Sequence, residues 1–137
     1  MTNRLRYGLG ALQVFIGVGA VAGGLGLVLD PSGETVGIPI ELLDRTPFAT
    51  FLFPGIVLFI VNGLGSVAGA IASFARQRYA GEMAVALGAF LVAWVAIQVC
   101  WMEPHWLHAL YFSLGILEVA LGSSMRKSIL RSGGPAA

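Results

Sequence analysis

Residues 8–29 read GLGALQVFIGVGAVAGGLGLVL, an apolar stretch without a single charged side chain. About 20 such residues are enough for an α-helix to cross the hydrocarbon core of a membrane. Three further, mostly apolar stretches follow at residues 51–74, 82–100 and 106–122. The sequence therefore predicts an all-α fold, a bundle of four transmembrane helices that forms one integral membrane domain over residues 1–137.

The composition agrees with a membrane protein. Of the 137 residues, 57% are hydrophobic and 11% are charged, whereas a soluble domain carries about 25% charged residues. Nucleic-acid binding requires a basic surface or a stacking platform, and we expect no nucleic-acid partner because the sequence offers neither. A single cysteine, Cys100, excludes an intrachain disulfide and a CxxC redox pair.

The positive charges divide unequally between the two sides of the predicted bundle. Seven of the eight Lys and Arg residues belong to the side that carries both termini and the turn between the second and third spans. Lys and Arg are retained on the cytoplasmic side of a membrane, so the sequence predicts that both termini are cytoplasmic. The seven residues are Arg4, Arg6, Arg76, Arg78, Arg126, Lys127 and Arg131. Only Arg45 lies on the outer side.

The connections between the spans differ in length. The first is a longer outer loop in which Pro39 precedes an apolar segment, and we expect a short interfacial helix at residues 40–44 that caps the outer end of the bundle. Residues 123–137 are polar and basic, and we expect them to form a frayed cytoplasmic tail. Pro54 either starts the second helix or kinks it, and a start is the commoner case.

Small residues recur at four-residue spacing in three of the spans. Such steps allow two helix backbones to approach closely in lipid, either between two copies of the chain or within one bundle. Packing within one bundle is the favoured interpretation, because contacts within a single chain satisfy the same pattern. The steps are Gly19 with Gly23, Gly65 with Gly69, and Ala84 with Gly88.

Glu118 is the most informative polar residue because it lies inside the fourth span. Ionisable groups within a membrane face the interior and often mark a site. His108, Tyr111, Gly115 and Glu118 are spaced by three, four and three residues, so they share one face of the helix. We expect that face to point into the bundle. Glu118 is either a proton-carrying or ligand-contacting carboxyl group, or a protonated acid that hydrogen-bonds a neighbouring helix.

The other polar side chains within the spans are Gln13, Asn62 and Gln98. Gln13 lies at a depth comparable with that of Glu118 and is its first candidate partner. Interhelical hydrogen bonds are the commoner role of such groups, and ligand contact is the alternative.

Several possible metal ligands cluster near the outer end of the fourth span. Sulfur together with imidazole would suit copper, but one local cluster rarely completes a coordination sphere, and two haem-binding histidines would need to lie on different helices. We therefore expect no cofactor and treat metal binding as the weaker alternative. The residues are Cys100, Met102, Glu103, His105 and His108.

The stretch TPFATFLFPGIVLFIVNG at residues 46–63, which follows a short acidic loop, and LYFSLG at residues 110–115 resemble small four-span inner-membrane proteins of bacteria to which no activity is assigned. This resemblance implies a bacterial plasma (inner) membrane. The four-span plan also resembles the DoxX-like family, without a motif that secures the link. Small multidrug transporters are similar in length and span number, but their membrane glutamate lies in the first span, so its role does not carry over to Glu118.

These observations favour a non-enzymatic membrane protein, either a binder of a lipid or another hydrophobic ligand or an accessory subunit of a larger complex. A small oligomeric transporter that couples protons through Glu118 is the first alternative. A membrane enzyme that acts on a lipid or a quinone is the second. The expected partners are the lipid bilayer, a hydrophobic ligand, and further copies of the chain or a larger membrane complex.

Overall fold

Four helices that are long and apolar enough to cross a membrane dominate the structure, a computed structural model that describes residues 3–101 and 106–131. They are α1 (Asn3–Leu29), a composite second helix (Leu52–Phe74), α4 (Ala80–Trp101) and α5 (Trp106–Arg131). No β-strand occurs within the described residues. The prediction of an all-α fold with four apolar spans is therefore confirmed.

The second helix is not a regular α-helix throughout. It consists of α2 (Leu52–Val57), a π-helical turn η2 (Leu58–Leu64) and α3 (Gly65–Phe74). The N–H of Gly65 donates to the carbonyl of Ile60, five residues earlier, which is the π-helical hydrogen bond. Pro54 is the third residue of α2, where backbone N–H groups have no partner within the helix anyway. Proline thus marks the start of this helix, as predicted, but the π turn was not foreseen.

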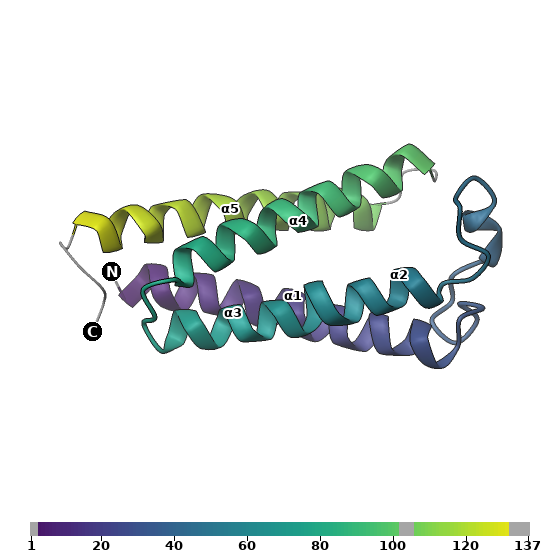
Figure 1. Cartoon of the computed structure of the whole chain (residues 1–137), viewed down its shortest axis with the longest axis horizontal. Helices are drawn as coiled ribbons and strands as arrows, with labels where there is room; N and C mark the ends of the chain where they lie inside the picture. Colours follow the sequence, from purple (N-terminus) through teal and green to yellow (C-terminus); the bar gives the residue numbers. More distant parts are fainter. Residues whose placement is uncertain (1–2, 102–105, 132–137) are drawn as a thin grey trace.

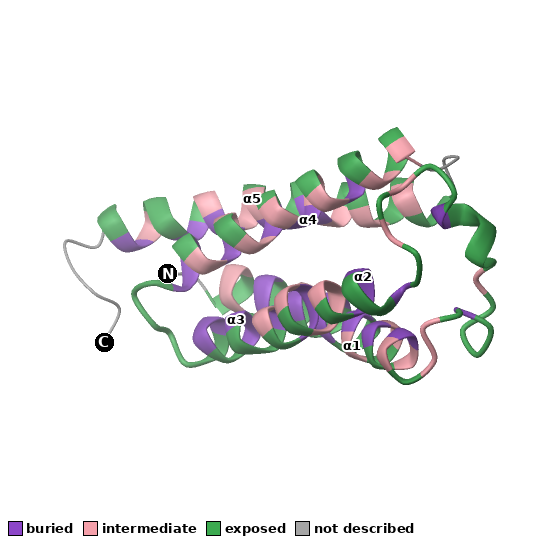
Figure 2. Cartoon of the chain, turned by 45° about the vertical axis from the view of Figure 1, so that its right-hand side comes forward, coloured by how far each residue is buried: buried purple, intermediate pink, exposed green. Residues whose placement is uncertain are grey.

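The helices form two hairpins, which Figure 1 shows as two layers. In the first hairpin α1 packs along α2, η2 and α3, and in the second hairpin α4 packs along α5. Contacts within each hairpin are more extensive than contacts between the hairpins. Buried residues lie on the sides of the helices that face one another, and exposed residues lie on the outer sides (Figure 2). Many of the exposed residues carry large apolar side chains. We call the contact between the two hairpins the seam.

Glycine backbones hold the first hairpin together. A Cβ atom on Gly24 would lie 2.6 Å from the backbone nitrogen of Phe59, and one on Gly63 would lie 3.1 Å from the backbone nitrogen of Val21. The small-residue step of Gly19 with Gly23 gives this hairpin no close backbone contact. Gly19 is exposed, and a Cβ on Gly23 would meet only the Leu58 side chain, at 3.6 Å. Close approach depends on which face meets the partner helix, and four-residue spacing does not specify that face.

The π turn explains the spacing of the glycines on the second helix. Gly55 and Gly63 both pack against α1 although they are eight residues apart. In a regular α-helix, eight residues turn by about 80° beyond two full turns, so the two glycines would lie toward opposite edges of one face. The wider π turn absorbs the extra residue. It therefore keeps both glycines in contact with α1.

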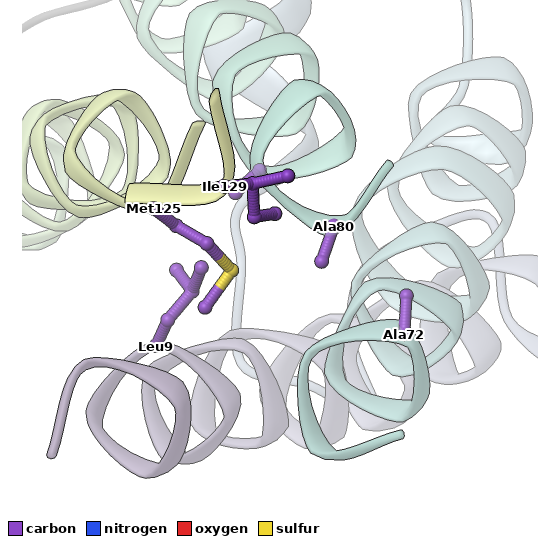
Figure 3. Close-up of a cluster of buried hydrophobic side chains, with 6 residues drawn as sticks. Leu9, Ala72, Ala80, Met125 and Ile129 are labelled. Carbon is purple, nitrogen blue, oxygen red and sulfur yellow. The ribbon is translucent and has the colours of Figure 1, made fainter. Parts of the chain in front are cut away.

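The fourth spanning helix is longer than predicted. The expected frayed tail from residue 123 is wrong up to Arg131, because α5 continues to that residue. Met125 is fully buried, Ile129 is 7% exposed, and both pack into a cluster with Leu9. Figure 3 shows Met125 and Leu9 pointing toward one another between α5 and α1. The polar residues of this segment misled the sequence prediction, although Met125 and Ile129 continue the inward face at four-residue spacing. The tail residues 132–137 lie outside the described part of the chain.

The connection between α1 and the second helix contains the predicted short helix, a 3₁₀ turn η1 (Ile40–Leu43). Leu43 is buried against Leu27 and Phe51, and this contact caps the end of the first hairpin. Phe48 in the same connection also meets the ring of Trp101 from α4, with a centroid separation of 6.0 Å. The loop therefore contacts both hairpins.

Candidate functional site

A row of hydrogen-bonded polar side chains crosses the seam. The hydroxyl of Ser73 in α3 donates to Oε1 of Gln13 in α1 over 2.9 Å. Nε2 of Gln13 in turn donates to Oε2 of Glu118 in α5 over 3.2 Å. All three side chains are fully buried. The predicted inward direction of Glu118 and its contact with Gln13 are both present in the structure.

Glu118 is incompletely satisfied. Its second carboxyl oxygen, Oε1, is buried and finds no hydrogen-bond partner among residues 3–101 and 106–131. An unpaired buried polar atom costs about 1 to 3 kcal/mol. No Lys or Arg forms an ion pair with Glu118 in the described chain, and Arg126, on the same helix, pairs with Glu82 over 3.3 Å at the protein surface. The seam thus presents a carboxyl oxygen that another group could engage.

Small residues bring the two helices of the second hairpin close together beside Glu118. A Cβ on Gly122 would lie 2.7 Å from the Cβ of Ala84, and one on Gly115 would lie 2.9 Å from a methyl carbon of Val92. Glu118 lies between these two glycines on the same face of α5. Tight packing on both sides fixes the α5 backbone, so the carboxyl group is held toward α1.

The cytoplasmic-side end of the seam, by the predicted orientation, is filled with apolar side chains. Leu9, Met125 and Ile129 pack there with Ala72, Ala80 and Ala84 (Figure 3). Leu9 precedes Gln13 by one helical turn of α1. The polar row is therefore covered on this side by an apolar cluster.

Asn62 is a second incompletely satisfied group. It lies in the π turn η2, is 2% exposed, and its Nδ2 atom is buried without a hydrogen-bond partner in the described part of the protein. Its neighbours on the helix show where it points. A Cβ on Gly63 would contact Val21 of α1, and a Cβ on Gly65 would contact Leu87 of α4. Asn62 lies between these two directions and therefore faces the interior of the bundle.

The remaining candidates are placed differently. Tyr111 is half-buried with Ile16, Leu91 and Val95, and its hydroxyl oxygen would lie 3.1 Å from a Cβ on Gly19, so it reaches α1 across the seam. His108 is half-buried about one turn before Tyr111, toward the start of α5. Gln98 is half-buried near the end of α4, about 15 Å along that helix from Gly88, and it is not part of the row.

The predicted metal cluster falls largely on residues that the structure does not describe. Met102, Glu103 and His105 are among residues 102–105, outside the described ranges. Cys100 is exposed. Within the part of the chain that is described, no three His, Cys, Asp or Glu side chains gather where they could hold a metal ion.

Sequence reasoning missed Ser73. Asn62, Ser66, Gly69 and Ser73 are spaced by four, three and four residues, and all four are buried. This spacing defines one face of the second helix. The same signal that identified the face of Glu118 on α5 would have identified Ser73. Comparisons of this chain with protein-family models, curated proteins and solved structures returned no match.

Proposed function

We propose that this protein is a multi-pass membrane protein that binds a lipid-like ligand in the seam between its two hairpins, with a hydroxyl group of the ligand at Glu118. The observation that carries the proposal is the buried Oε1 atom of Glu118, which has no partner in the described residues while Oε2 is held by Gln13. A hydroxyl suits this position because it can donate to a carboxylate oxygen and can also accept from a protonated one.

The surroundings favour an amphipathic ligand. Apolar side chains of Ile16, Leu91 and Val95 form a buried cluster in the seam, and Ile16 follows Gln13, the partner of Glu118, by three residues on α1. A ligand with one polar end and an apolar body would match this combination of one polar group and apolar walls. Because the hairpins contact each other less than their own helices do, they can separate more easily at the seam than within a hairpin.

The setting we propose is the plasma membrane of a bacterium, with both termini cytoplasmic and the η1 loop outside. The Lys and Arg distribution supports the orientation. The apolar cluster of Leu9, Met125 and Ile129 favours a binder over a proton-linked transporter, because a transporter requires polar access to the carboxyl group from both sides.

The test compares two probes that differ only in the polar end, oleyl alcohol and cis-9-octadecene, by native mass spectrometry of the protein in mild detergent. One hydrogen bond predicts a preference of about fivefold for the alcohol. Glu118→Leu should abolish the preference. Glu118→Gln should retain it, since an amide still donates and accepts. Ser113→Leu, a polar-to-apolar change at an exposed position of the same helix, is the matched control.

The proposal fails if the wild-type protein shows no preference for the alcohol, or if Glu118→Leu leaves the preference intact. The transport alternative has a separate signature. In vesicles that contain a pH-sensitive dye, a transporter would move protons when a substrate is added, and Glu118→Gln would stop that movement because the amide cannot carry a proton.

A further inference from the structure

The π turn of the second helix presents a buried amide donor. This donor has no role in binding the ligand hydroxyl that we propose at Glu118. Nδ2 of Asn62 lies in the interior without a partner among the described residues. π turns are rare and occur frequently at functional sites, because the widened backbone sacrifices regular hydrogen bonding to place particular side chains. Here the widened turn lets Gly63 pack against α1 while Asn62 faces the interior.

The offset between the levels of Asn62 and Glu118 along the helix axis can be estimated on α1. Glu118 is bonded to Gln13. A Cβ on Gly17 would contact the carbonyl of Gly63, and a Cβ on Gly63 would contact Val21, so the π turn lies between the levels of Gly17 and Val21. The midpoint of these levels is six residues beyond Gln13, or about 9 Å of helix.

This separation fits two polar groups of one small headgroup. Two hydrogen bonds of about 3 Å each cover about 6 Å of this axial offset, which leaves at least about 3 Å between the two ligand atoms that accept or donate them. A hydroxyl and an ester carbonyl carried on neighbouring carbons of glycerol are separated by a distance of this order. A free fatty alcohol offers only the first group, and a simple fatty ester offers only the second.

We propose that Asn62 is a second recognition residue that donates a hydrogen bond to a carbonyl oxygen of the ligand, so that the site selects a hydroxyl-bearing acylglycerol. This inference rests on the proposed function, because the same ligand contacts Glu118 through its hydroxyl. An amide NH₂ group donates and does not accept, so the ligand atom at Asn62 must be an acceptor. Recognition of two groups gives a selectivity that neither side chain provides alone.

The experiment uses three probes, each with one oleyl chain: monoolein, with both hydroxyls and a carbonyl; oleyl alcohol, with a hydroxyl alone; and methyl oleate, with a carbonyl alone. Retention on the wild-type protein should be at least fivefold greater for monoolein than for either other probe. Asn62→Leu should lower the retention of monoolein to that of oleyl alcohol. Asn62→Ala, which leaves more room in the π turn, should do the same if the leucine variant fails to fold.

The variants separate this inference from the proposed function. Glu118→Leu should lower the retention of monoolein to that of methyl oleate, because Asn62 still recognises the carbonyl. Gln98→Leu, which removes a half-buried amide near the end of α4, is the matched control and should leave all three probes unchanged. The inference is overturned if the Asn62 variants lower the retention of all three probes equally, which is the result expected of a purely structural asparagine. It is also overturned if they preserve the preference for monoolein over oleyl alcohol. If the wild-type protein retains methyl oleate as strongly as monoolein, hydroxyl recognition at Glu118 and the proposed function fail. A preference for monoolein over oleyl alcohol that Asn62→Leu removes would still leave carbonyl recognition by Asn62 standing.

Discussion

Gly88 of α4 and Gly115 of α5 face each other so closely that each would place a side-chain carbon against the other's backbone. A Cβ on Gly88 would lie 2.7 Å from the carbonyl oxygen of Gly115, and a Cβ on Gly115 would lie 3.1 Å from the carbonyl oxygen of Gly88. Gly81 and Gly122 repeat the arrangement seven residues away on each helix. The second hairpin is therefore a contact between two backbones, and Glu118 lies at its centre.

Gly88→Ala should separate α4 from α5 and lower the thermal stability of the protein in detergent. The added carbon meets backbone atoms, which cannot move aside as a flexible side chain can, so we expect a cost in the range of overpacking, about 1 to 3 kcal/mol. Gly8→Ala is the matched control, because nothing lies within 4 Å of a Cβ at that position. Equal melting temperatures for the two variants would contradict the close contact.

Met125→Ala should destabilise the bundle although it lies in a segment of polar composition. Met125 is fully buried against Leu9, and truncation of a buried methionine costs about 2 kcal/mol or more. Leu130→Ala is the control, since Leu130 is 67% exposed on the same helix. Thermal unfolding of the two variants measures the difference. A frayed segment after residue 122 would instead make both substitutions neutral.

Asp30 should make the loop after α1 sensitive to acid. Its carboxylate accepts hydrogen bonds from the hydroxyls of Ser32, at 2.6 Å, and Thr35, at 2.7 Å. These bonds, the one from Ser32 first, lower the pKa of Asp30 from 3.8 to about 2. A lowered pKa means that the bonds stabilise the folded loop fully above about pH 4, and that this contribution is lost as the pH falls toward 2.

Asp30→Asn should therefore lower the melting temperature slightly at pH 7, and the difference from the wild-type protein should stay constant down to about pH 4. Below that pH the difference should narrow. Asp44→Asn, at an exposed position in the same connection, is the control. A difference that grows on acidification would mean that the carboxylate is not the form that the loop stabilises.

A reporter fused after Ala137 should be found in the cytoplasm, and one inserted between Ser32 and Glu34 should be found outside. Seven of the eight Lys and Arg residues favour one orientation, which argues against chains that insert both ways. Enzymatic reporters that are active on only one side of the membrane measure this directly. An appreciable fraction of molecules with an external C-terminus would refute the single orientation.

The sequence was sufficient for the spans and for the inward face of Glu118, because apolar length and helical spacing are local properties. It was also sufficient for the contact of Glu118 with Gln13, since few polar groups exist at that depth. The glycine contacts of Gly24 and Gly63 could not be predicted, because they depend on which faces meet. No residue type or spacing in the sequence predicts the π turn at Asn62. The extension of α5 was missed because Arg126 and Lys127 conceal the apolar spacing of Met125 and Ile129.

The order in which the polar row is completed has a consequence for biosynthesis. Gln13 and Ser73 belong to the first hairpin and can bond as soon as that hairpin has entered the membrane. Glu118 belongs to the second hairpin, and its bond to Gln13 forms only when the hairpins meet. A chain whose second hairpin has inserted but not docked therefore presents a carboxyl group toward lipid, at a cost of a few kcal/mol. The cell's membrane quality control would recognise such an unassembled chain by the carboxyl group of Glu118 that faces lipid.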